Sequence, residues 1–281
     1  MKVILFLFLA TASFGLLAKT VVVTIPPLAS AIKPLLNKSD KVVVLLSENQ
    51  SAHHFSLKPS HLYSLAKADL IISVGLGLDD WAGKAIERSG VKHISLSEVD
   101  GVKLLDANAK KQGHEHHHEH HKNVDPHLWL DIDNIKQLAV KVSSEIKTKH
   151  KLVSWLEQLD TANKDINNRL QKIKNKPFLV QHAGFQYFEK KYNLTNLGAV
   201  QTNDAGAGLK KILALRKKME KESIRCIFTS PHGSTKQVAA LVSGLKQSVK
   251  IVTLNAMGAP NLNTVQVMQD LTQRYLQCLS D

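Results

Sequence analysis

The sequence predicts an α/β protein in which two lobes with mostly parallel sheets are joined by one long rigid helix. Short runs of apolar, mostly β-branched residues alternate with helix-period segments early in the chain, and the alternation returns near its end. Between these blocks lies a stretch whose apolar residues recur every three, four or seven positions. Alternating strands and helices are typical of parallel sheets covered by helices, and two such blocks indicate two lobes.

The first segment, residues 1–18, has the features of a secretory signal peptide. Lys2 supplies an early positive charge, an apolar stretch follows, and Ala18 is a small residue suited to cleavage. A membrane-spanning helix would need about 20 apolar residues, and the chain turns polar at Lys19. No cysteine follows the apolar segment, so we expect no lipid anchor there. The segment predicts a soluble protein in the periplasm.

The first lobe is expected over residues 19–148. Its predicted strands are continuously apolar, as in parallel strands buried on both faces. They are Val21–Ile25, Val42–Leu46, Leu70–Val74 and Lys92–Leu96. The helices predicted between them are Leu28–Leu36, Pro59–Lys67 and Asp79–Ser89. A histidine-rich loop over residues 106–124, expected to be disordered, interrupts this lobe.

The linking helix is expected within residues 149–175. Its apolar stripe is made of Leu152, Leu156, Leu159, Ile166, Leu170 and Ile173. From His150 to Lys174 such a helix would be about 37 Å long, at 1.5 Å per residue. A helix is stiff where a Gly/Ser linker is not, so we expect only small hinge motions between the lobes.

The second lobe is expected over residues 176–281. Its predicted strands are Phe178–Gln181, Asn196–Val200, Cys226–Thr229 and Val249–Leu254. Its predicted helices are Phe185–Tyr192, Gly208–Glu222, Thr235–Lys246 and Thr264–Leu279. Cys226 and Cys278 are the only two cysteines, and an oxidising compartment would let them pair in a disulfide. Neither has the closely spaced partner that a zinc site would need.

The formal net charge of +13 raises the question of nucleic-acid or membrane binding. The positive residues do not concentrate, however. The densest group, within Gly208–Glu222, includes Glu220 and Glu222 and looks like a solvated helix face. Aromatic residues, which stack on bases, make up only 5% of the chain. We therefore expect no nucleic-acid partner.

A histidine tract points to metal chemistry. Six of the fourteen histidines fall within eight residues: His114, His116, His117, His118, His120 and His121. Neutral imidazole ligates zinc and also suits copper and nickel, and no packed core needs so many imidazoles. The tract predicts a loose accessory metal loop, which either collects ions for a tighter site or acts as an incidental sink for copper or nickel.

Three further histidines stand at the mouths of predicted βα connections or at a helix start, where ligands bind in open α/β sheets. His53 follows a predicted strand, His127 follows Asp125-Pro126 before a helix, and His182 ends a strand. Each alone is more often an ordinary histidine. Together, beside the tract, they favour a metal site.

The segments around these histidines, residues 53–60, 125–131 and 182–188, resemble those of the metal-binding solute receptors of bacterial ABC importers. The closest resemblance is to the high-affinity zinc receptors of the ZnuA type, and it extends over essentially the whole mature chain. It includes the histidine-rich insertion and the two late cysteines. The resemblance implies two α/β lobes with the metal in the cleft between them, and it assigns the ligands to His53, His127 and His182.

The same resemblance indicates which metal is bound. Manganese receptors of this family carry a glutamate at the position of His182, and three imidazoles suit zinc better than manganese. Asn255 stands where the family often has an aspartate, so the fourth ligand is open. A water is the first expectation, and His232 is the protein candidate, with Asn255 a poorer one. Asp125 and Asp131 flank His127 and are candidate hydrogen-bond partners of a ligating imidazole, although an Asp before Pro also commonly starts a turn.

The resemblance implies a monomeric receptor, not an enzyme, which captures Zn²⁺ and delivers it to a membrane permease with a cytoplasmic ATPase. One alternative is a secreted zinc-dependent hydrolase, because three histidines and a water also hold catalytic zinc. No HExxH segment is present to support it. Another alternative is a receptor of the same family for manganese, nickel or copper.

Overall fold

The computed structural model describes residues 18–47, 50, 55–107, 124–201, 208–231, 233–259 and 261–280. In this part of the chain the strands form two separate four-stranded sheets, both fully parallel. The strand orders are β2-β1-β3-β4 and β6-β5-β7-β8, so the second sheet repeats the order of the first. In each sheet the second strand lies on one side of the first, and the third and fourth strands lie on the other side. The carboxyl ends of the two central strands at such a switch point are where ligands bind in open α/β sheets.

The first sheet is formed by the four apolar runs that the sequence predicts as strands. They are β1 (Thr20–Val23), β2 (Lys41–Val44), β3 (Leu70–Ser73) and β4 (His93–Ser95). The helices that follow its strands are α1 (Pro26–Ile32), which continues as a 3₁₀ turn (Lys33–Leu35), α2 (Pro59–Ala66), α3 (Asp80–Ser89) and a 3₁₀ turn (Leu96–Glu98). Val22 and Ile71 in the centre of the sheet are completely buried, as expected for strands covered on both faces.

The second sheet is built in the same way from β5 (Phe178–His182), β6 (Asn196–Gln201), β7 (Cys226–Thr229) and β8 (Lys250–Thr253). Its helices are α6 (Gln186–Lys191), α7 (Leu209–Lys221), α8 (Thr235–Val242) and α9 (Thr264–Leu279). The eight strands predicted from the sequence are thus confirmed, with ends that agree or differ by at most two residues. The two-lobe α/β fold is confirmed with them.

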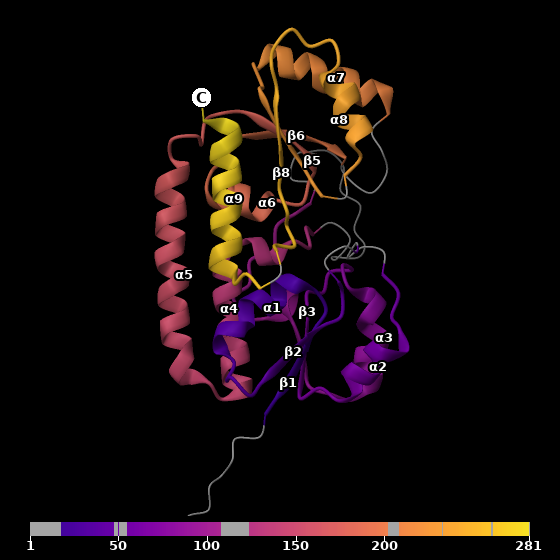
Figure 1. Ribbon diagram of the computed structural model, residues 1–281, viewed down its shortest axis with the longest axis vertical. Helices are drawn as coiled ribbons and strands as arrows, with labels where there is room; N and C mark the ends of the chain where they lie inside the picture. The colour runs from indigo at the N-terminus through magenta and orange to yellow at the C-terminus, as the bar shows by residue number, and fades with distance from the viewer. Residues whose placement is uncertain are drawn as a thin grey trace, which may run out of the picture.

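A helical layer connects the lobes. A 3₁₀ turn (Leu128–Leu130) leads into α4 (Ile132–Ile146), and α5 (Lys149–Leu170) runs beside α4 and α9 along one side of both lobes (Figure 1). With 22 residues, α5 is about 33 Å long. It is shorter than the predicted helix, because residues 171–175 form a turn ahead of β5, which begins at Phe178. Ile173, predicted on the helix, is buried in this turn.

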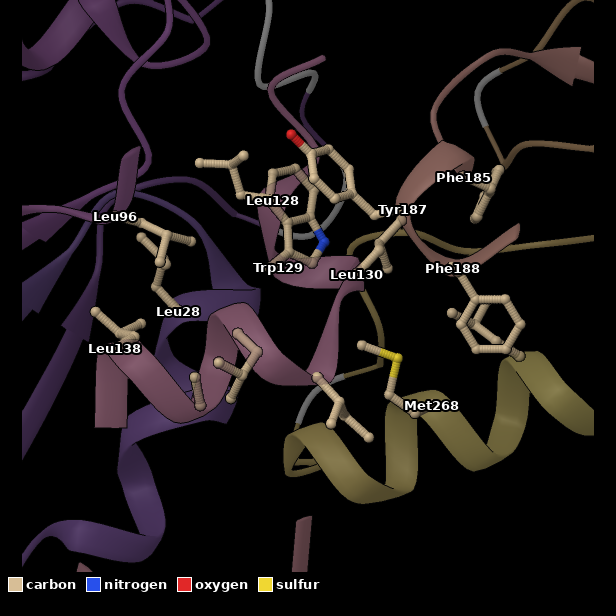
Figure 2. Packing of buried hydrophobic residues seen from close by; sticks show 14 of the residues in the cluster. Leu28, Leu96, Leu128, Trp129, Leu130, Leu138, Phe185, Tyr187, Phe188 and Met268 are labelled. Atoms are coloured by element: carbon tan, nitrogen blue, oxygen red, sulfur yellow. The ribbon is translucent and has the colours of Figure 1, made fainter. Parts of the chain in front are cut away.

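One hydrophobic core extends across the boundary between the lobes. It contains strand residues of both sheets together with residues of α1, α4, α5, α6 and α9. Figure 2 shows Leu28 and Leu138 of the first lobe on one side of the turn that carries Trp129, and Phe188 and Met268 of the second lobe on the other. Because the lobes share this core, their relative position is set by packing as well as by the linking helix.

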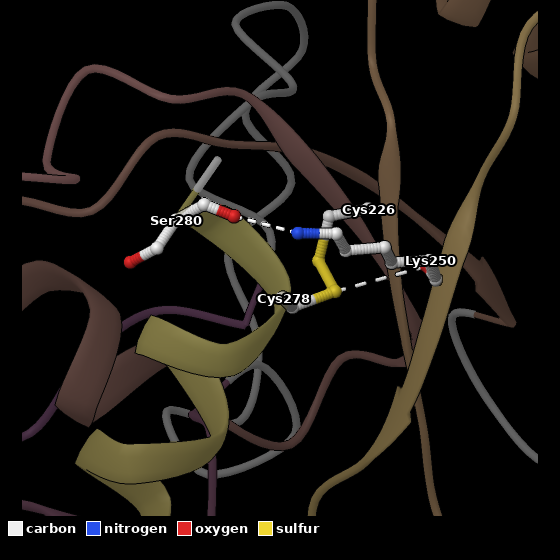
Figure 3. The surroundings of a disulfide bond; sticks show 4 residues. All are labelled: Cys226, Lys250, Cys278 and Ser280. Carbon is white, nitrogen blue, oxygen red and sulfur yellow. Dashed lines mark hydrogen bonds between the residues drawn. A yellow bond between two sulfur atoms is a disulfide. The ribbon is translucent and has the colours of Figure 1, made fainter.

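The predicted disulfide between Cys226 and Cys278 is present, with Cα atoms 5.7 Å apart. It joins the last turn of α9 to the start of β7 (Figure 3). Beside it the Lys250 ammonium donates to the Ser280 carbonyl at 2.6 Å. Among the described residues, no helix has the length and apolar character that crossing a membrane requires.

Candidate metal centre

His127 lies in a buried loop whose geometry is set by Asp125. One carboxylate oxygen of Asp125, Oδ1, accepts from the backbone N–H of His127 at 3.0 Å and lies 2.7 Å from the ring Nδ1 of the same residue. The first contact is the turn that an Asp before Pro favours, and the second orients the imidazole. The same oxygen of Asp125 thus makes the turn contact and the contact that would orient a ligating imidazole.

The contact with Asp125 decides which nitrogen of His127 can ligate a metal. A carboxylate at Nδ1 favours the tautomer with hydrogen on that nitrogen, which makes Nε2 the atom that would bind a metal. Burial raises the pKa of Asp125, but hydrogen bonds from the His127 ring and backbone and from Gln186 outweigh it and hold the pKa below its ordinary value. The carboxylate form that supports the imidazole is thus favoured.

His182 brings the second imidazole from the other lobe. It is the last residue of β5, a central strand at the switch point of its sheet. Its ring meets the ring of His127 edge to face, with ring centroids 5.5 Å apart. The backbone of Gly184 lies between them, since a Cβ there would stand 2.9 Å from both His127 Nε2 and His182 Cδ2. Two of the three expected ligands therefore meet where the lobes face each other.

Trp129 packs against the His127 ring of this histidine pair. Its ring centroid is 5.2 Å from that of His127, and its indole N–H donates to the Ala256 carbonyl in the second lobe at 2.7 Å. Ala256 lies in a turn that Asn255 holds. The Asn255 side chain accepts from the Met257 N–H at 3.0 Å and donates to the Gly258 carbonyl at 2.8 Å.

These contacts bear on two of the predicted site residues. Both the oxygen and the nitrogen of the Asn255 amide form hydrogen bonds within the turn. The turn therefore accounts for an asparagine at this position without a metal. Asp131 caps α4 by accepting from the Asp133 N–H at 2.9 Å and forms an ion pair with Lys191 of α6 at 3.1 Å. Its contacts are those of a helix cap and an inter-lobe ion pair. The metal-site roles considered for Asn255 and Asp131 stay predictions.

The remaining predicted ligands lie outside the described residues. They are His53, His232 and the six histidines of the tract, His114, His116, His117, His118, His120 and His121. Within the described ranges, no group of three or more His, Cys, Asp or Glu side chains is placed to hold a metal ion. The structure thus describes one pair of imidazoles, and the other predicted ligands stay predictions.

The described residues next to position 232 contact the strand that ends in His182. Gln181, completely buried at the end of β5, accepts from the Ser230 N–H at 3.2 Å and donates to the Ser234 carbonyl at 2.9 Å. The described residues on both sides of position 232 are therefore fixed to the strand that ends in His182.

Sequence reasoning gave no role to Gln186, the first residue of α6. Its amide donates to Asp125 Oδ2 at 2.9 Å. Gln186 lies within the motif that begins at His182, but the contact depends on how the lobes pack, which a linear motif does not record.

One cavity bounded by described residues is separate from the histidine pair. It has a volume of about 720 Å³ and lies on the first lobe, between α3 and the strands β3 and β4. His93 lines it, with its ring Nε2 2.8 Å from the Ser73 hydroxyl. Neither His127 nor His182 lines it.

Comparison with known proteins assigns the chain to a family. The family model described as "Zinc-uptake complex component A periplasmic", ZnuA, matches residues 21–278. The chain belongs to the ZnuA family. The match includes both lobes, His127, His182 and both cysteines, so the resemblance seen in the three histidine segments is confirmed over nearly the whole chain.

Individual relatives of the ZnuA family agree. The high-affinity zinc uptake system protein ZnuA of Haemophilus ducreyi is 27% identical, over 92% of this chain and 93% of its own. The protein of the same name from Yersinia pestis is 26% identical, over 95% of this chain and 93% of its own. These alignments leave no large part of either relative unmatched.

Solved structures show the same fold. A crystal structure of ZnuA superposes with a TM-score of 0.78 at 19% identity, covering 94% of this chain and all of the other. The periplasmic zinc-binding protein TroA of Treponema pallidum gives a TM-score of 0.76 at 19% identity, with the same coverage. At these identities the superpositions support the two-lobe architecture, whereas the family model carries the family assignment.

Proposed function

We propose that this chain is a periplasmic receptor that binds Zn²⁺ between its two lobes and passes it to the permease of an ABC importer. The observation that carries the proposal is the meeting of His127 and His182, one imidazole from each lobe, with His127 oriented by a buried carboxylate. His53 is the proposed third ligand, with a water or His232 in the fourth position. Related proteins named for high-affinity zinc uptake support zinc as the ion.

Several parts of this proposal rest on sequence. Residues 1–18 would direct export and be removed, residues 19–148 and 176–281 would be the metal-binding lobes, and residues 149–175 would link them. The receptor would act as a monomer, since binding and delivery need one cleft. The histidine tract would hold zinc loosely near the cleft.

Zinc is favoured over manganese by the chemistry of the pair. Imidazole nitrogen suits zinc, whereas manganese prefers oxygen ligands. Because imidazoles bind metal only when neutral, zinc affinity is expected to fall as the pH is lowered towards 6. Manganese should compete weakly, whereas copper and nickel, which also accept imidazole, are the stricter controls.

The alternative of a zinc-dependent hydrolase is disfavoured by the position of the Asp125 carboxylate. A hydrolase needs a base directed at the zinc-bound water. Asp125 lies on the Nδ1 side of His127, away from the Nε2 that would face the metal, and its oxygens already accept from His127 and Gln186. This carboxylate is therefore placed to support a ligand and not to activate a water.

The deciding experiment measures zinc retained by the mature protein lacking residues 113–122, after zinc loading and a brief challenge with a moderate chelator. One zinc per chain is expected, and the additional change His127→Ala should abolish its retention. His93→Ala, in the separate cavity of the first lobe, is the matched control and should keep its zinc. Complete loss of zinc on removing residues 113–122 alone would place the binding in the tract and refute the proposed cleft site.

Delivery requires its own test in cells. A strain lacking this protein should grow poorly in medium depleted of zinc by a chelator. The wild-type chain should restore growth, and His127→Ala should not. Equal growth with His127→Ala would show that the cleft pair is not needed for zinc supply.

A further inference from the structure

Asp125 is held from both lobes. Its Oδ1 faces the backbone and ring of His127 in the first lobe, and its Oδ2 accepts from the Gln186 amide of the second lobe at 2.9 Å. Its backbone carbonyl accepts from the Tyr187 hydroxyl at 3.0 Å. Asp125 is only 2% exposed. Adjacent residues of α6 thus fix separately the carboxylate and the main chain of the residue that orients His127.

We propose that Gln186 is a positioning residue for zinc binding, acting through Asp125 on the imidazole of His127. The inference rests on the proposed function, since it concerns the affinity of the same site. Gln186 itself would not touch the ion. Its amide would fix the rotation of the Asp125 carboxylate, so that Oδ1 stays directed at His127 Nδ1 and Nε2 stays directed at the metal.

Gln186 matters for the orientation of Asp125 because a carboxylate group rotates easily about its terminal side-chain torsion. The terminal torsion of an aspartate is broad, and both contacts from His127 are made to Oδ1, so they leave the position of Oδ2 and the plane of the carboxylate loosely defined. A second donor on Oδ2 defines that plane. A buried carboxylate oxygen that loses its donor also carries a desolvation cost, which favours other rotamers. Without the Gln186 amide, Asp125 would hold the His127 ring less firmly.

The position of Gln186 in the chain couples the two ligands. It lies four residues after His182, so one short segment supplies a ligand from the second lobe and braces the ligand of the first. The tyrosine beside it provides an internal comparison. The Tyr187 hydroxyl accepts from the Leu105 N–H at 2.9 Å and donates to the Asp125 backbone, without touching the carboxylate.

The competing explanation is that Gln186 only holds the lobes together. In that case its loss would lower the stability of the metal-free protein and leave zinc affinity unchanged. A positioning role predicts a loss of zinc affinity that depends on the carboxylate of Asp125. The two explanations therefore differ in affinity and in coupling to Asp125.

The test is a double-mutant cycle in the mature protein lacking residues 113–122, with zinc affinity measured by chelator competition. Gln186→Met keeps the length of the side chain and removes its donor, and we expect zinc affinity to fall roughly 3- to 10-fold. Asp125→Asn, which changes the direct partner of the ligand, should cost roughly 10- to 100-fold. The double variant should bind no more weakly than Asp125→Asn alone, because the effects of coupled residues are not additive. Tyr187→Phe is the matched control and should change affinity less than Gln186→Met.

A spectroscopic readout supports the cycle. Long-range ¹⁵N–¹H spectra of the metal-free protein should show His127 in a single tautomer with hydrogen on Nδ1, and a mixture of tautomers in Gln186→Met. If Gln186→Met does not fold, Gln186→Ala removes the amide without adding volume and takes its place in both measurements.

The outcomes separate this inference from the proposed function. Wild-type affinity in Gln186→Met, or losses that add fully to those of Asp125→Asn, would overturn the positioning role. Unchanged zinc affinity in His127→Ala would instead overturn the proposed function. A wild-type site that depends on His127 and not on Gln186 would therefore refute only the inference about Gln186.

Discussion

Gly184 approaches the His127 ring so closely that a Cβ on Gly184 would lie 2.9 Å from His127 Nε2. The same atom would lie 2.9 Å from His182 Cδ2. Real Cβ atoms essentially never come this near to a ring atom, so any side chain at this position must displace one imidazole or both. The absence of a side chain at Gly184 is thus part of how the two rings meet.

The first prediction is that Gly184→Val lowers zinc affinity at least about tenfold, comparable to the loss of a hydrogen-bond partner of a ligand. The backbone of Gly184 is not in the left-handed region, so valine should be tolerated by the main chain. The variant should therefore fold, and chelator competition should detect the lost affinity. Gly83→Val, on the exposed side of α3 with nothing within 4 Å of its Cβ, is the matched control. Wild-type affinity in Gly184→Val would show that the ring pair does not form the site.

The fold was largely predictable because buried strands need apolar residues, which can be recognised in short stretches of sequence. Runs such as Val21–Ile25 and Leu70–Val74 are almost entirely apolar, as expected for parallel strands covered on both faces. Helix ends were less predictable. The apolar stripe continues to Ile173, and periodicity does not reveal that a buried residue after Leu170 sits in a turn.

The candidate site was predictable only where the residue type itself indicates metal binding, as histidine does. His182 stands out as a histidine at the end of a strand and His127 as one just before a helix, and the structure brings them together. Gln186 and Gly184 carry no such signal, because a glutamine or a glycine is common everywhere. Their roles arise from the approach of the two lobes, to which residues distant in sequence contribute.

A second prediction concerns Trp129, whose indole donates to Ala256 across the lobes. Trp129→Phe keeps an aromatic ring beside His127 and removes the donor, which should lower the free energy of unfolding by about 1 kcal/mol. Zinc should change the tryptophan emission of the wild type, and this change should disappear in Trp129→Phe. Trp155, buried against the Ala31 carbonyl in the first lobe, should not report on zinc. Its replacement by phenylalanine is the control, and loss of the zinc signal there would contradict the assignment.

A third prediction separates stability from binding at the disulfide. Cys226 and Cys278 are 52 residues apart, and the chain-entropy estimate for such a loop is about 4 kcal/mol. Replacing both by alanine should lower the free energy of unfolding of the metal-free protein by about that amount, as measured with denaturant. Zinc affinity should stay at the wild-type value. Leu179 pairs with Ile227, so Cys226 lies level with Phe178, at the end of β5 opposite to His182. A large loss of affinity in the folded double variant would show that the disulfide shapes the cleft.

The last prediction concerns Asp40, which joins the start of β1 to the loop before β2. Its carboxylate accepts from the Lys19 N–H at 2.9 Å and from the Asn37 N–H at 2.7 Å. Burial raises the pKa of Asp40, but these two backbone hydrogen bonds and the positive charges of Lys19 and Lys151 together outweigh it, and the pKa lies below its ordinary value. Cleavage after Ala18 would turn the Lys19 nitrogen into a charged amino terminus, directly beside this carboxylate.

A lowered pKa in the folded protein fixes the direction of the pH effect. The stabilisation is present above the ordinary pKa of about 4 and is lost as the pH falls through the lower folded-state value. Asp40→Asn should therefore reduce the free energy of unfolding of the metal-free protein at pH 7 by about 1 kcal/mol, a modest amount because the site is partly exposed to solvent. The difference from the wild type should shrink below pH 4. Two proteins should be compared at pH 7, one that begins at Lys19 and one that keeps Ala18 and residues before it. The Asp40→Asn effect should be larger in the first, because only there is the Lys19 backbone nitrogen a charged ammonium beside Asp40. Equal effects in the two proteins would show that the new terminus does not pair with this carboxylate.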